Sequence, residues 1–252
     1  MTLWRLEWLR VLRTRRWLAL VGTFVFFGFL GPLTAAYLPE IISMAGGDLE
    51  GATITLPPAT AADGIGQFAS NALQIGTLVA AVVAAGATTL DAIPEMGVFL
   101  RTRVANLRVA LVPRIVVTAV VVVVAWLLGV GTAWYETWAL LGAPATSAML
   151  WGSVLGAAYL VFVVTLVAAV ASRARTVLAT VIASVLILLV MPLFGISDAI
   201  GRWLPSHLAG ALPALASGST VAGDYVAATA VTMVATVGLA VLSFRLAGRH
   251  TA

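Results

Sequence analysis

The chain has 252 residues, of which 62% are hydrophobic and only 10% are charged. A soluble domain carries about 25% charged residues, so this composition excludes a water-soluble protein and indicates an integral membrane protein. Every basic residue is arginine and cysteine is absent. These absences exclude Schiff-base lysines, the lysine of a Walker A loop and every thiol-based site.

The residues before the first long apolar run are unusually basic, with five arginines among the first 16. They predict an amphipathic helix over 2–16 that lies in the membrane interface, or alternatively a plain basic anchor. On that helix the apolar stripe comprises Trp4, Trp8, Val11 and Leu12, and the opposite side comprises Glu7, Arg10, Arg13 and Thr14.

Long runs without a charged residue locate the membrane spans, since a helix needs about 20 apolar residues to cross the hydrocarbon core. They predict an all-α integral membrane protein with six transmembrane helices, forming a single transmembrane domain over 1–252. The predicted spans are 17–38, 68–90, 115–135, 148–171, 176–197 and 225–244.

One further uncharged run, 203–223, is a poor helix for facing lipid. It contains Pro205, Gly210, Pro213 and Gly218, all of which disfavour a continuous helix. We therefore expect a re-entrant outer segment between helices 5 and 6, packed against protein.

The distribution of arginine fixes the expected orientation. With six spans, all arginines except Arg202 lie on one side, and by the positive-inside rule that side is the cytoplasm. Both termini are then cytoplasmic, whereas a seventh span would move Arg245 and Arg249 outside. Because the arginines flank apolar runs, a nucleic-acid partner is excluded. Arginine-only usage with abundant Ala and Val indicates a GC-rich genome, and hence a prokaryotic plasma membrane.

The predicted spans contain no Asp, Glu, Lys or Arg, which argues against an ion-coupled transporter. Among their weakly polar residues, Asn71 and Gln74 are the best candidates for a substrate path. The alternative is that they make hydrogen bonds between helices. Neither a catalytic constellation nor a metal site is predicted, because two histidines cannot alone build a metal centre.

The loop between the second and third spans is the most distinctive polar segment. Pro94 and Glu95 suit the first turn of a short helix, which would carry both apolar and charged residues. Such a helix predicts a docking surface, or alternatively a helix that lies on the bilayer. The candidate residues of this loop are Asp91, Glu95, Gly97, Leu100, Arg101 and Arg103.

In the order of its elements the chain resembles the membrane subunit, or permease, of ABC-2 type ABC transporters. A basic amphipathic helix, a first span, a long outer loop, a second span and a charged inner loop follow one another along nearly the whole chain. Glu95, Gly97, Leu100 and Thr102 match the family's inner-loop pattern in type, whereas Val98 replaces a threonine. The segment Trp203-Leu-Pro-Ser-His207 is similar to the family's outer re-entrant region.

The resemblance implies a transport subunit and not an enzyme. Two copies of a separate ABC ATPase subunit would dock on the 91–114 loop and hold ATP and Mg, with no cofactor in this chain. A second permease subunit would complete a homodimer or a heterodimer in the lipid bilayer. The expected activity is export of an amphipathic drug, peptide or lipid. The alternatives are import, an ATP-independent transporter or channel, and a membrane assembly protein without transport.

Overall fold

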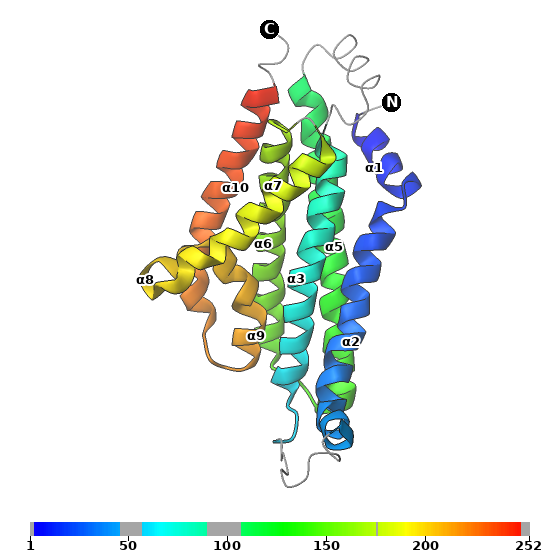
Figure 1. Ribbon diagram of the computed structural model, residues 1–252, viewed down its shortest axis with the longest axis vertical. Helices are drawn as coiled ribbons and strands as arrows, with labels where there is room; N and C mark the ends of the chain where they lie inside the picture. The colour runs from blue at the N-terminus through cyan, green and yellow to red at the C-terminus, as the bar shows by residue number, and fades with distance from the viewer. Residues whose placement is uncertain (1–2, 46–56, 90–106, 175, 248–252) are drawn as a thin grey trace.

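The computed structural model describes residues 3–45, 57–89, 107–174 and 176–247, which form helices joined by turns (Figure 1). The predicted inner-loop residues between 91 and 103 lie outside these ranges. The elements are α1 (Leu3–Arg13), α2 (Arg16–Ala45), α3 (Ala61–Thr88), α5 (Leu107–Leu141), α6 (Thr146–Ala171), α7 (Val177–Val190), η3 (Met191–Ile196), α8 (Asp198–Gly201), η4 (Pro205–Gly210), α9 (Ala211–Ala216), η5 (Ala222–Tyr225) and α10 (Val226–Ala247).

Six helices in the described part of the chain are long and apolar enough to cross a membrane. Each of the six predicted ranges overlaps one of them, so the prediction of an all-helical chain with six such helices is confirmed. These candidate spans are Arg16–Ile42, Ala61–Thr88, Leu111–Leu141, Thr146–Ala171, Val177–Gly195 and Ala222–Leu246.

Several helices are longer than predicted. The helix α5 has 35 residues, about 52 Å at 1.5 Å per residue, and therefore exceeds a hydrocarbon core of about 30 Å. It continues through Arg108, Arg114 and Glu136, because the backbone hydrogen bonds of a helix do not require apolar side chains. The helix α3 begins seven residues before the predicted start at 68. Asp63 in its first turn accepts hydrogen bonds from the backbone and the hydroxyl of Thr60, at 2.8 and 2.7 Å.

The core lies where α2, α3, α5 and α6 meet around Trp126 of α5. The fully buried indole is stacked on Phe68, with ring centres 5.5 Å apart, and meets the edge of Phe24 at 5.7 Å. Its Nε1 donates a hydrogen bond to the Ser153 carbonyl at 2.9 Å, which satisfies a polar group that would be costly to bury unpaired. A Cβ at Gly156 would lie 2.5 Å from this ring, so α6 approaches Trp126 closely only because residue 156 has no side chain.

The closest helix pair, α2 and α5, also depends on small residues. A Cβ at Gly28 would lie 2.7 Å from the Gly129 carbonyl oxygen, and a Cβ at Gly129 would lie 2.7 Å from that of Phe24. Small residues let helix backbones approach within a membrane, where dispersion contacts drive association. Substitution of either glycine would force the two helices apart.

The remaining helices are arranged less regularly. The helix α7 runs obliquely from the end of the bundle that carries α1 to about half its height, where α8 lies (Figure 1). The chain then returns through η4 and α9, whose Leu208 and Leu212 are fully buried, to α10. A Cβ at Gly152 of α6 would lie 2.5 Å from the Leu212 side chain, so this segment packs directly on the core.

Candidate functional site

The N-terminal helix α1 presents two different faces. Trp4, Trp8 and Leu12 recur every four residues and are 45%, 40% and 55% exposed, so one stripe points away from the bundle. Glu7 and Arg10 point towards α5 and α3, and Val11 lines a pocket against α5. Val11 was predicted on the tryptophan stripe; it lies on the protein-facing side because α1 packs beside α5. Arg13, the remaining predicted residue of this helix, is exposed.

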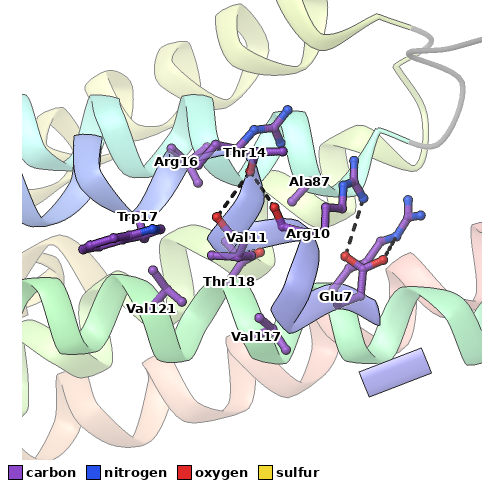
Figure 2. A pocket seen from close by; sticks show the side chains of 12 residues that line it. Glu7, Arg10, Val11, Thr14, Arg16, Trp17, Ala87, Val117, Thr118 and Val121 are labelled. Atoms are coloured by element: carbon purple, nitrogen blue, oxygen red, sulfur yellow. Dashed lines mark hydrogen bonds and ion pairs between the residues drawn. The ribbon is translucent and has the colours of Figure 1, made fainter. Parts of the chain in front are cut away.

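An ion-pair cluster fastens α1 to the start of α5 (Figure 2). Arg114 Nε donates a hydrogen bond to Glu7 Oε1 at 2.8 Å, and both side chains are largely buried. Arg10 Nη1 lies 3.5 Å from Glu7 Oε2, and Arg10 Nη2 donates to the Gly86 carbonyl at 3.4 Å. Breaking such a pair leaves a charge with little water around it, so the cluster should hold α1, α3 and α5 together.

A small pocket of about 20 Å³ lies beside this cluster, with Arg16, Trp17 and Thr118 in its wall (Figure 2). That volume suffices for one water molecule. The pocket is therefore too small for a nucleotide or a transported compound, and the cluster is best understood as a structural joint.

A second polar contact lies at the same end of the bundle. The hydroxyls of Thr89, directly after α3, and Thr180 of α7 lie 3.3 Å apart and are buried. Thr89 and Arg114 stand on either side of the stretch 90–106. The residue before that stretch thus contacts α7, and the helix after it contacts α1.

The two predicted substrate-path residues lie on an exposed polar stripe of α3. Gln74 is exposed and Asn71 is half-buried. Asp63, Gln67 and Ser70 precede Gln74 at helical spacings of four, three and four residues, and all three are exposed. The inner half of the same face is apolar, with Ile75, Leu78 and Val82 exposed.

A cavity of about 640 Å³ lies at the outer end of this stripe, away from α1. Its lining comes from α2, the first turns of α3 and the segment around α9. Its volume is within the range of about 300–1,000 Å³ that small-molecule sites occupy. The described residues that line it are Ala35, Leu38, Pro39, Pro57, Pro58, Ala59, Ala62, Asp63, Gly66, Gln67, Gly210, Pro213, Ala214 and Ser217.

Sequence reasoning did not find this cavity. Gly210 and Pro213 of its wall were interpreted only as helix breakers, and Asp63 lies before the span predicted to start at 68. The spacing of Asp63, Gln67, Ser70 and Gln74 was an available signal, because four polar residues on one face of an apolar helix are unusual. The wall supplied by α9 was not predictable from local sequence.

Within the described ranges, no group of three or more His, Asp and Glu side chains gathers as it would around a metal ion. The predicted inner-loop residues Asp91, Glu95, Gly97, Leu100, Arg101 and Arg103 cannot be placed relative to the joint at Arg114, since they lie outside those ranges. No family model matches the chain, and neither a curated protein nor a solved structure matches it.

Proposed function

We propose that the chain is the membrane-spanning permease subunit of an ATP-driven transporter of the ABC-2 type, working as an exporter. One observation carries the proposal: the stretch 90–106 is bounded on both sides by contacts to other helices, Thr89 with Thr180 and Arg114 with Glu7. A force applied to this stretch would therefore reach α7 and α1 as well as α3 and α5. Such a linkage is what a transport subunit driven by a separate motor requires.

In this proposal two ABC ATPase subunits dock on the predicted 91–114 loop, of which 107–114 form the first turns of α5, and ATP and Mg are bound by those partners. Asp91, Glu95, Gly97, Leu100, Arg101 and Arg103 supply the docking surface. Closure of the ATPase pair pushes on the loop and rocks α3 and α5 between inward-open and outward-open forms. The Arg114–Glu7 pair carries the movement to α1.

The transport path would run along α3, between this chain and a second permease subunit. Asn71 and Gln74 offer amide groups at the middle of α3, and the cavity beyond Gln67 offers an exit. Polar side chains exposed at this depth are costly against lipid, which supports a wet or protein-covered surface there. The partner is a second copy or a related chain, and the compound is an amphipathic drug, peptide or lipid.

The membrane placement follows from the exposed side chains. Trp4 and Trp8 enter the interfacial layer of the cytoplasmic leaflet, as tryptophan prefers, while Arg13 faces lipid phosphates. The segment 203–223 is the re-entrant outer segment, which packs on α6 through η4 and α9 and on α10 through η4. Both termini face the cytoplasm of a prokaryotic cell.

The first test is copurification. The tagged chain is extracted in mild detergent from its native membrane, and the bound proteins are identified. The proposal expects a P-loop ATPase in about equal amount, and ATP hydrolysis that responds to transported compounds. Purification of a chain that is fully active in liposomes without an ATPase would contradict it.

The second test concerns the loop. Glu95→Gln and Arg101→Ala should each uncouple ATP hydrolysis from the transported compound without loss of the folded permease. Asp224→Asn is the matched control, because Asp224 lies outside the loop and caps the start of η5 through Val221. Unchanged coupling in both loop variants would count against the docking site.

A further inference from the structure

The outer cavity combines apolar walls with a single charged side chain. Alanine, leucine and proline supply most of its lining, and Gln67 and Ser217 add neutral polar groups. Asp63 is the one charged residue among the described residues of the wall. A pocket of this kind favours a ligand that is mainly apolar and carries one compensating charge.

The sign of that charge follows from Asp63. The described residues of the cavity lining include this carboxylate and no arginine. Thr60 fixes the Asp63 carboxylate at the rim by two hydrogen bonds, and the residue is exposed, so it is ionised at neutral pH. A carboxylate beside apolar walls attracts cations and repels anions.

From this arrangement we infer that the outer cavity between α2, α3 and α9 binds a lipophilic organic cation, with Asp63 as its counter-charge. The aromatic or alkyl body of the cation rests on the apolar wall, and the positive centre lies near the carboxylate. The inference deepens the proposed function, since it narrows the amphipathic cargo to cations. Binding itself does not require an ATPase partner.

Gly66 gives a direct way to fill the cavity. A Cβ at this position meets no atom within 4 Å, although the residue lines the cavity wall. Gly66→Leu would therefore project a side chain into the cavity without colliding with the backbone. Gly131→Leu is the matched control, because Gly131 of α5 is exposed, also has free space around its Cβ and lies outside the cavity.

Asp63→Asn tests the charge. Asparagine keeps an oxygen that can accept from Thr60, so the start of α3 should survive. Asp224→Asn is its matched control, since Asp224 Oδ2 accepts from the Val221 backbone at 2.9 Å in the same local arrangement but lies outside the cavity lining.

The experiment measures equilibrium binding of tetraphenylphosphonium to the chain in nanodiscs, with no ATPase present. Tetraphenylborate, an anion of the same shape, is measured in parallel. We expect saturable binding of the cation, weakened about fivefold by Asp63→Asn, as for an exposed ion pair. Gly66→Leu should weaken it about tenfold or more, whereas both control variants should bind as the parent does.

Three outcomes would overturn the inference: no saturable binding of the cation, equal affinity for tetraphenylborate, or unchanged binding in Gly66→Leu. The second outcome is a real competitor, because the free N–H groups in the first turn of α3 favour anions. Failure here leaves the proposed function standing, since copurification with an ATPase does not depend on the cargo. Conversely, cation binding without any ATPase partner would support this inference while the transporter proposal failed.

Discussion

Two faces of the bundle are equally open yet differ in chemistry. On α7, Leu178, Leu186 and Leu189 are 69%, 62% and 65% exposed. On the outer half of α3 the exposed residues are polar, with Gln74 at the centre of the helix. A leucine-covered face is unusual in contact with water, whereas an amide-covered face is unusual in contact with hydrocarbon.

This difference shows that the exposed fraction of a side chain in one isolated chain does not tell whether water, lipid or protein covers it. The face of α7 suits direct contact with lipid tails, whereas the outer face of α3 needs water or a protein partner. In the proposed function the polar stripe is the face that water or a second permease subunit covers. Each face should tolerate the kind of side chain, charged or apolar, that destabilises the other.

The largest difference is expected from introducing a charge at the middle of each helix. Leu186→Arg places a guanidinium against lipid tails and should cost about 2.5–3.5 kcal/mol of membrane-inserted stability. Gln74→Arg, at the middle of α3, should cost much less. The measurement is the folded fraction by fluorescence-detected size exclusion, together with the thermal midpoint. Equal losses in the two variants would mean that both faces contact lipid.

The next largest effect on stability is expected from breaking the ion-pair cluster of Glu7, Arg10 and Arg114. Glu7→Gln removes the carboxylate between Arg10 and Arg114, so about 1–3 kcal/mol of stability should be lost. The double variant Glu7→Gln/Arg114→Gln should recover part of this loss, because no buried charge is left unpaired. The measurement is the thermal midpoint of the purified chain. If both variants retain the parent's midpoint, the cluster does not fasten α1 to α5.

A smaller effect on stability is expected from removing an amide of the stripe. Gln74→Leu should change stability by no more than about 0.5 kcal/mol, as an exposed substitution usually does. Transport should nevertheless fall if α3 lines the path. The two readouts are the thermal midpoint and substrate-stimulated ATP hydrolysis of the purified complex. Normal stimulation in this variant would remove Gln74 from the path.

The smallest effect on stability is expected from single cysteine substitutions, which test directly whether water reaches each face. The chain has no cysteine, so single cysteines report cleanly on access to water. Gln74→Cys should react with a membrane-impermeant maleimide in intact cells, and Leu186→Cys should not, with stability nearly unchanged in both. The labelled fraction is read by mass spectrometry. Equal labelling would contradict the assignment of water to the face of α3 and of lipid to the face of α7.

The helices were largely predictable because uncharged runs of about 20 residues have few alternative folds. Their ends were not: α5 extends through Arg108 and Glu136, and the Thr60–Asp63 cap starts α3 early. The search for uncharged runs ends each span at the first charged residue, whereas a helix ends where its backbone hydrogen bonds end.

The candidate site was only partly predictable. Asn71 and Gln74 stood out as amides within an apolar run, but the cavity wall from α9 depends on tertiary packing. The contact between Glu7 and Arg114 joins residues 107 positions apart. Each looked like an ordinary flanking charge, so no local pattern could have revealed the pair.

That long-range contact also bears on biogenesis. Glu7 leaves the ribosome 107 residues before its counter-ion Arg114, and two hydrophobic segments are synthesised between them. Until then the N-terminal helix lacks its ion-pair partner on α5. Completion of the third segment therefore acts as a checkpoint, and nascent chains halted before residue 114 should expose an epitope on this helix that the finished protein hides.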